Sequence, residues 1–165
     1  MAGVSLTSFP NPVNEKAART VAGCVVVIAL VALLAGWLWL TVPLALGFAA
    51  RVLAGPRFSP LGQFATRVVA PRLGVPRLVA GPPKQFAQGM GLTFTAAAAV
   101  AHFGFGADTV TRVLLAMLVV AAVLESVFAL CLGCKVFALL MRAGLVSAEV
   151  CEACNDISLR TRQTV

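Results

Sequence analysis

Charged residues are scarce in this sequence. Asp, Glu, Lys and Arg make up 12% of its 165 residues, whereas hydrophobic residues make up 60%. An average soluble domain carries about 25% charged residues. The mean hydropathy of +0.96 is typical of a protein that lies in a bilayer. The composition therefore excludes an ordinary soluble domain and predicts an integral membrane protein.

Two kinds of sequence signal are also missing. The net charge of +7 comes from Lys and Arg residues that flank apolar runs, without the aromatic-interleaved basic motif typical of nucleic-acid binding. We therefore expect the lipid bilayer as a partner and no nucleic acid. The first 20 residues lack an Arg-rich start, and the apolar run after Arg19 is followed by further apolar runs, so we expect no cleaved signal peptide.

Apolar runs predict an all-α membrane protein, a four-transmembrane-helix bundle made of two helical hairpins. The expected spans are residues 17–36, 40–54, 86–103 and 109–131, because about 20 apolar residues cross a bilayer core. Residues 1–15 form an N-terminal tail, and residues 16–144 form the membrane domain. The second run is short for a full span, so a re-entrant hairpin is the alternative.

The basic residues predict the orientation of this bundle. With four spans, twelve of the 13 Lys and Arg residues fall on one side of the membrane, and only Arg112 falls on the other. Cytoplasmic loops carry the excess of Lys and Arg in membrane proteins. We therefore expect a multi-pass protein of the cytoplasmic (inner) membrane with both termini in the cytoplasm.

Residues 55–85 form the expected cytoplasmic loop between the two hairpins. Ser59-Pro60 is typical of a helix start, and apolar residues then recur on one helical face. This pattern predicts an amphipathic helix that lies on the membrane surface. Arg57, Arg67 and Arg72 are candidate contacts for lipid headgroups, and a site for an anionic substrate is the alternative.

Gln88 and Glu125 are the candidate polar site residues within the expected spans. Glu125 is the one acid there, and an unpaired charge in a membrane span is costly. We interpret it as a polar contact that joins helices through Gln88 or Thr93, with a proton or ion relay as the alternative. On one continuous helix Glu125 would point about 180° away from Cys134, so we expect it to stabilise the bundle more than it acts on a thiol.

Four of the five cysteines form the pattern C-x2-C-x16-C-x2-C, namely Cys131, Cys134, Cys151 and Cys154. We expect the first pair at the C-terminal end of the fourth helix, where the helix dipole raises a thiol pKa. The second pair lies in residues 145–165, the expected cytoplasmic tail, and a hairpin between the pairs would let them meet.

The four cysteines support two different functions. As two candidate catalytic dithiols they would carry out thiol-disulfide exchange or sulfur handling. As four thiolates they would bind one structural zinc ion, which predicts a membrane scaffold or a transport accessory protein with zinc as its cofactor. A transport role in which the cysteines are incidental is a third alternative. Cys24 stands alone in an apolar run and is expected to be a core residue.

Several short stretches occur together in one known family. They are Val13-Asn14-Glu15-Lys16, Gly55-Pro56-Arg57-Phe58-Ser59-Pro60, Val69-Ala70-Pro71-Arg72-Leu73, Pro83-Lys84-Gln85-Phe86-Ala87-Gln88-Gly89 and Cys131-Leu132-Gly133-Cys134. In these stretches the chain resembles the bacterial integral-membrane family called domain of unknown function 4395. The resemblance implies a four-helix membrane architecture with a paired-cysteine motif, and no particular reaction.

The genes of that family often lie near thioredoxin-like and rhodanese-like genes. The resemblance therefore implies a soluble thioredoxin-like or rhodanese-like partner and a role in thiol or sulfur chemistry. We leave the oligomeric state open, including a homo-oligomer.

Overall fold

The computed structural model describes residue 9 and residues 12–146, and helices dominate this part of the chain. Its longer helices are α1 (Glu15–Leu34), α2 (Thr41–Ala54), α5 (Gly81–Phe105), α6 (Asp108–Phe128) and α7 (Leu132–Arg142). Short helical turns connect them: η1 (Leu38–Leu40), η2 (Gly55–Arg57), α3 (Pro60–Phe64), η3 (Ala65–Val69) and α4 (Ala70–Arg72). The expectation of a mainly helical chain is confirmed.

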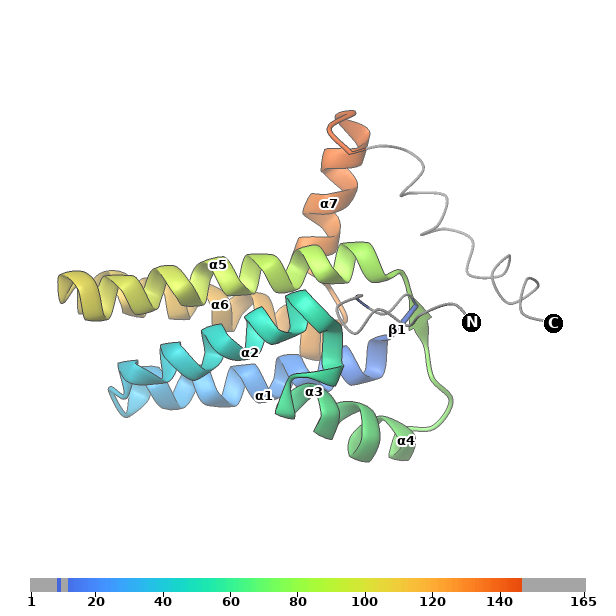
Figure 1. Cartoon of the computed structure of the whole chain (residues 1–165), viewed down its shortest axis with the longest axis horizontal. Helices are drawn as coiled ribbons and strands as arrows, with labels where there is room; N and C mark the ends of the chain where they lie inside the picture. Colours follow the sequence, from blue (N-terminus) through green and yellow to red (C-terminus); the bar gives the residue numbers. More distant parts are fainter. Residues whose placement is uncertain (1–8, 10–11, 147–165) are drawn as a thin grey trace.

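The helices α1, α2, α5 and α6 lie side by side and alternate in direction (Figure 1). α2 packs against α5, α5 against α6, and α6 against α1. Ala29, Ala32 and Leu115 are fully buried in the shared core. Small residues at such contacts let helix backbones approach closely, which replaces the hydrophobic driving force that is missing in lipid.

Three helical segments of the described residues are long and apolar enough to cross a membrane, namely Glu15–Leu34, Leu38–Arg72 and Asp108–Phe128. The second segment joins α2 to the turns that follow it. α5 is not among them, and it is richer in glycine and glutamine. Large apolar side chains such as Val27 and Leu46 are exposed on the outside of the helices, and exposed apolar surface of this kind marks contact with lipid. These features indicate a membrane protein.

The last long helix ends earlier than the sequence suggested. We expected a span through residue 131, but α6 ends at Phe128 because Ala129 adopts a left-handed conformation with φ 56°. The Leu130 N–H then donates to the Leu124 carbonyl at 2.9 Å. The chain turns sharply at this point, and α7 leaves the bundle across its axis (Figure 1).

A side chain from α1 donates hydrogen bonds to the last carbonyls of α6. The Arg19 guanidinium donates to the Ser126 carbonyl at 2.9 and 3.0 Å and to the Val127 carbonyl at 3.1 Å. The last four carbonyls of a helix lack partners within the helix, and a basic side chain can bind them. The end of α6 is thus fixed by a residue 107 positions earlier in the sequence.

The loop before α5 is more ordered than a simple linker. The Ser59 side chain caps α3 by accepting a hydrogen bond from the Gly62 N–H, which confirms the predicted helix start. Strand β1 (Val13–Asn14) pairs antiparallel with β2 (Leu78–Val79). The Glu15 carboxylate also pairs with the Arg77 side chain at 2.9 Å. These contacts join the start of α1 to the chain that leads into α5.

Candidate functional site

The first cysteine pair lies at the beginning of a helix. Cys131 is the N-cap residue of α7, and its Sγ accepts a hydrogen bond from the Cys134 N–H at 3.3 Å. The expectation that this pair ends the fourth helix is therefore wrong, because the chain turns at Ala129 and starts a new helix. The N-terminal end of a helix has positive potential, so the dipole of α7 favours a thiolate on Cys131.

The two thiols of this pair have different acidities. The pKa of the Cys131 thiol is lowered, first because the Cys134 side chain donates a hydrogen bond to its sulfur, and further because Lys84 lies nearby. Burial and the Glu125 carboxylate oppose this shift. The pKa of the Cys134 thiol is raised, first by the same hydrogen bond and then by burial. Cys131 is therefore the more acidic thiol of the pair.

Gly133 allows α7 to lie directly on α5. A Cβ atom at position 133 would lie 2.5 Å from the Cα and Cβ atoms of Ala87 in α5. Only a residue without a side chain permits this approach. The glycine between the two cysteines thus sets the distance between the dithiol and the polar residues of α5.

Glu125 is paired with Lys84, and Lys84 is buried while Glu125 is half-buried. The Lys84 ammonium donates to the Glu125 carboxylate at 2.6 Å, and the side chains are 8% and 15% exposed. The sequence interpretation named Gln88 or Thr93 as the partner of Glu125, and neither is its partner in the structure. The turn at Ala129 also brings Glu125 and Cys131 to the wall of one cavity, so the expected divergence from the cysteines does not hold for Cys131.

Arg51 is a site residue that the sequence interpretation missed. It is 4% exposed, donates from Nε to the Gln88 side-chain oxygen at 2.8 Å and from Nη1 to Ser59 Oγ at 3.1 Å. Its guanidinium also lies over the Phe48 ring, 4.4 Å from the centroid. An arginine inside an apolar run is the sequence signal that could have identified it. The sequence interpretation counts it only among the basic residues that orient the bundle.

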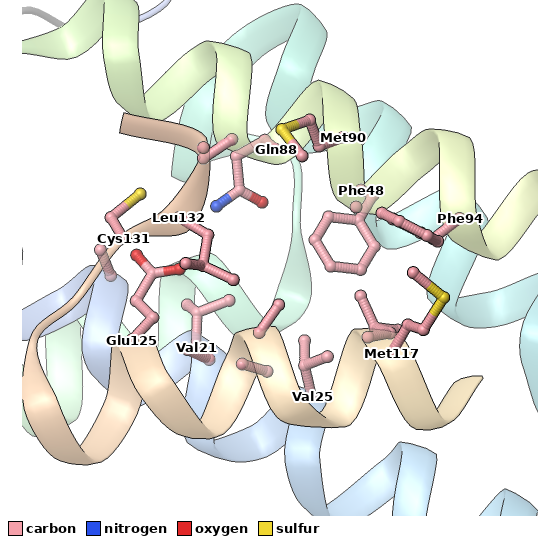
Figure 2. A pocket seen from close by; sticks show the side chains of 18 residues that line it. Val21, Val25, Phe48, Gln88, Met90, Phe94, Met117, Glu125, Cys131 and Leu132 are labelled. Carbon is pink, nitrogen blue, oxygen red and sulfur yellow. The ribbon is translucent and has the colours of Figure 1, made fainter. Parts of the chain in front are cut away.

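Two cavities meet at Cys131. The inner cavity has a volume of about 180 Å³ and lies among α1, α2, α5 and α6. Its walls are mainly apolar, and they include Phe48, Met90, Phe94 and Met117 together with three polar residues, Gln88, Glu125 and Cys131 (Figure 2). The outer cavity, about 360 Å³, is lined by residues that include Glu15, Lys84, Cys131, Cys134 and Lys135. Cys131 thus lines both cavities.

The other candidate residues do not join this site. Arg57, Arg67 and Arg72 are exposed, and within the described part of the chain none of them forms an ion pair. Cys151 and Cys154 lie outside the described residues. Among the described residues no group of three or more His, Cys, Asp or Glu side chains is arranged to hold a metal ion. The four-cysteine zinc site therefore remains a prediction from the spacing.

Comparison with known proteins identifies the family. No curated protein and no solved structure matches the chain. The family model described as Domain of unknown function (DUF4395) matches residues 13–142, which include every described residue of the dithiol site. The chain therefore belongs to the DUF4395 family.

Proposed function

We propose that this protein is a multi-pass protein of the bacterial cytoplasmic membrane whose Cys131–Cys134 dithiol exchanges disulfides, or carries sulfur, for a soluble thioredoxin-like or rhodanese-like partner. The position of the pair at the start of α7 is the observation that carries this proposal. Dithiols that react efficiently lie at helix N-termini, where the thiolate is stabilised. The outer cavity supports the proposal, since it leaves both cysteines within reach of a partner from the aqueous side.

The proposed topology has four spans, α1, α2, α5 and α6, with both termini in the cytoplasm. α5 is included because it packs between α2 and α6 and its 25 residues are long enough to cross the roughly 30 Å hydrocarbon core. Lys16 and Arg19 lie at the dithiol end of the bundle, whereas Arg112 contacts the Leu33 carbonyl at the other end. The positive-inside rule then places the dithiol in the cytoplasm.

The turns from α3 to α4 form an amphipathic element on the cytoplasmic membrane surface in this proposal. Ala65 and Ala70 are buried, while Phe64 and Arg67 are exposed. An exposed aromatic ring beside an exposed arginine is suited to the boundary between acyl chains and headgroups.

The order of steps in the exchange reaction follows from the different pKa values of the two thiols. The Cys131 thiolate attacks one sulfur of the partner's disulfide, and the second sulfur of the partner leaves as a thiolate. Cys134 then loses its proton and attacks the Cys131 sulfur of the mixed disulfide. The partner leaves as a dithiol, and Cys131 and Cys134 remain as a disulfide, so two electrons pass from this chain to the partner. The reverse sequence reduces the pair.

Trapping the mixed disulfide tests this function. The full chain with Cys134→Ser, incubated in detergent with an oxidised thioredoxin, should accumulate a covalent complex through Cys131, because the resolving thiol is absent. Cys131→Ser should accumulate no complex at this pair. Cys24→Ser is the matched control, since Cys24 lies in α1 and outside both cavities. Absence of any Cys131 adduct in the Cys134→Ser variant would contradict the proposal.

The orientation is tested separately with a membrane-impermeant thiol reagent. Cys131 and Cys134 should react only after spheroplasts are lysed. Labelling of either residue in intact spheroplasts would overturn the proposed topology.

A further inference from the structure

The inner cavity differs from the outer one in where it opens. Met117 lies on its wall and is 51% exposed on the outer surface of α6. Because α6 is one of the apolar segments that can cross a membrane, this surface faces acyl chains. A ligand would therefore reach the inner cavity from the bilayer, whereas the outer cavity is reached from water.

The charges around the inner cavity predict a neutral ligand. Glu125 is the only ionisable acid or base on its described wall, apart from the Cys131 thiol, and it is already paired with Lys84 at 2.6 Å. A charged ligand would find no free counter-charge there, and burial of an unpaired charge is costly. Phe48, Phe94, Met90 and Met117 form the apolar walls at the end away from Cys131 (Figure 2).

Gln88 supplies one oriented hydrogen-bond donor to this neutral ligand. Arg51 can only donate, so the Gln88 atom that it contacts at 2.8 Å must be the amide oxygen. The amide nitrogen is therefore turned away from Arg51 and toward the Glu125 and Leu132 side of the cavity (Figure 2). Among the described residues, the one hydrogen bond of the Gln88 side chain is the one that its oxygen accepts from Arg51. The matching ligand has an apolar body and an oxygen atom that accepts a hydrogen bond.

We propose that the inner cavity binds the ring of a lipid-soluble quinone, and that this quinone accepts two electrons from the Cys131–Cys134 dithiol. The inference rests on the proposed function of this pair. A quinone carbonyl is a neutral acceptor for the Gln88 amide, and its ring and tail are apolar. Cys131 lines both cavities, so the same thiol can meet a soluble partner on one side and a membrane carrier on the other.

The reaction balances without a further oxidant or reductant. One S–S bond forms between the Cys131 thiolate and Cys134, the S–H bond of Cys134 is lost, and the second proton comes from water. The quinone takes up two electrons and two protons, so each of its carbonyl oxygens becomes a hydroxyl and a quinol leaves the cavity. The Glu125 carboxylate lies on the cavity wall beside Cys131 and can hold a proton during the transfer (Figure 2).

Blocking the opening of the inner cavity tests this proposal in the full chain, reconstituted in lipid nanodiscs. The probe is decylubiquinone, whose reduction is followed by its ultraviolet absorbance after the dithiol has been reduced and the reductant removed. Met117→Trp should slow quinone reduction by at least about tenfold, because a bulkier side chain obstructs access. The matched control is Val120→Trp, since Val120 is 59% exposed on the same helix and does not line the cavity. That control should reduce the quinone at the wild-type rate.

A second variant removes only the hydrogen-bond donor. Gln88→Glu keeps an acceptor for Arg51 but has no N–H to offer the quinone. It should raise the apparent KM for decylubiquinone by about tenfold, the value of one hydrogen bond to a buried group. Unchanged kinetics in both Met117→Trp and Gln88→Glu, or no quinone reduction by the wild type, would overturn the quinone site.

Disulfide exchange with thioredoxin is measured on the same preparations. If exchange continues while quinone reduction is absent, the quinone inference alone is wrong. If the wild type shows no exchange, the proposed function of the dithiol is wrong as well.

Discussion

A methyl group at position 133 has no room in this structure. It would lie 2.5 Å from both the Cα and the Cβ atoms of Ala87 and 3.2 Å from the Ala87 nitrogen. Ordinary contacts of this kind are no closer than 3.4 Å, so in Gly133→Ala the first turn of α7 must retreat from α5 by about 1 Å. The obstructing atoms belong mainly to the backbone of α5 and cannot turn aside as a flexible side chain would.

The cost of this substitution can be estimated. Overpacking a tight contact costs about 1–3 kcal/mol, while replacing glycine by alanine within a helix returns up to about 1 kcal/mol. We expect the free energy of unfolding to fall by about 1 kcal/mol, mainly because α7 packs less closely against α5. The larger effect should be on chemistry, because Cys131 moves with α7 away from Lys84, which helps to lower its pKa.

Two measurements check this prediction. Thermal unfolding in detergent reports the loss of stability, and the rate of Cys131 alkylation near neutral pH reports the thiolate, which should become less abundant. Gly89→Ala is the matched control, because a Cβ atom at Gly89 in α5 meets nothing within 4 Å, and it should leave both quantities unchanged or slightly raise the stability. A Gly133→Ala protein with wild-type stability and wild-type alkylation would refute the packing argument.

Four further predictions concern the same region. Lys84→Met should lower the free energy of unfolding by about 3 kcal/mol, because it leaves the partly buried Glu125 carboxylate unpaired; Lys84→Met combined with Glu125→Leu should recover most of that loss, and additive losses in thermal unfolding would contradict the pairing. Arg19→Met should expose the last carbonyls of α6 and lower stability by about 2 kcal/mol, with faster hydrogen exchange at residues 126–131 as the specific readout. The lowered pKa of Cys131 means that its thiolate persists below the pH at which an ordinary thiol is protonated, so alkylation followed by mass spectrometry should modify Cys131 at pH values where Cys134 stays unmodified, and equal pH profiles for the two would contradict the assignment. Protein purified without chelator should contain far less than one zinc ion per chain if the dithiol is redox-active; about one per chain would favour the four-cysteine zinc site and a scaffold role.

The sequence predicted the elements of this fold better than their ends. Apolar runs and Ser59-Pro60 identified helices that the structure contains, because these signals are local in the chain. The end of α6 at Ala129 has no local sequence signal of this kind. The last turn of α6 lacks a basic residue, and its carbonyls are satisfied by Arg19 from another helix. The periodicity of apolar residues does not report a helix end that depends on a tertiary contact. This helix end is the reason that the cysteine pair lies at the start of α7, whereas the sequence predicted it at the end of α6.

The candidate site was predicted in its residue types but not in its partners. Cys131 and Glu125 were singled out because thiol pairs and intramembrane acids are rare. Lys84 was counted only among the residues that orient the protein. Its pairing with Glu125 joins positions 41 residues apart, and only the packing of α5 against α6 brings them together. The positions of charged residues along the chain thus predict the membrane topology. Which charged residues pair within a site can be predicted only when the contacts between helices are known.

The reach of Arg19 to the end of α6 has a consequence for the order of assembly during synthesis. α1 leaves the ribosome first, and its guanidinium has no α6 carbonyl to bind until more than 100 further residues have been added. The turn at Ala129 and the capped start of α7 form only when the last long helix has docked. Until that docking occurs, we expect Cys131 to lack the helix start and the nearby Lys84 that favour its thiolate.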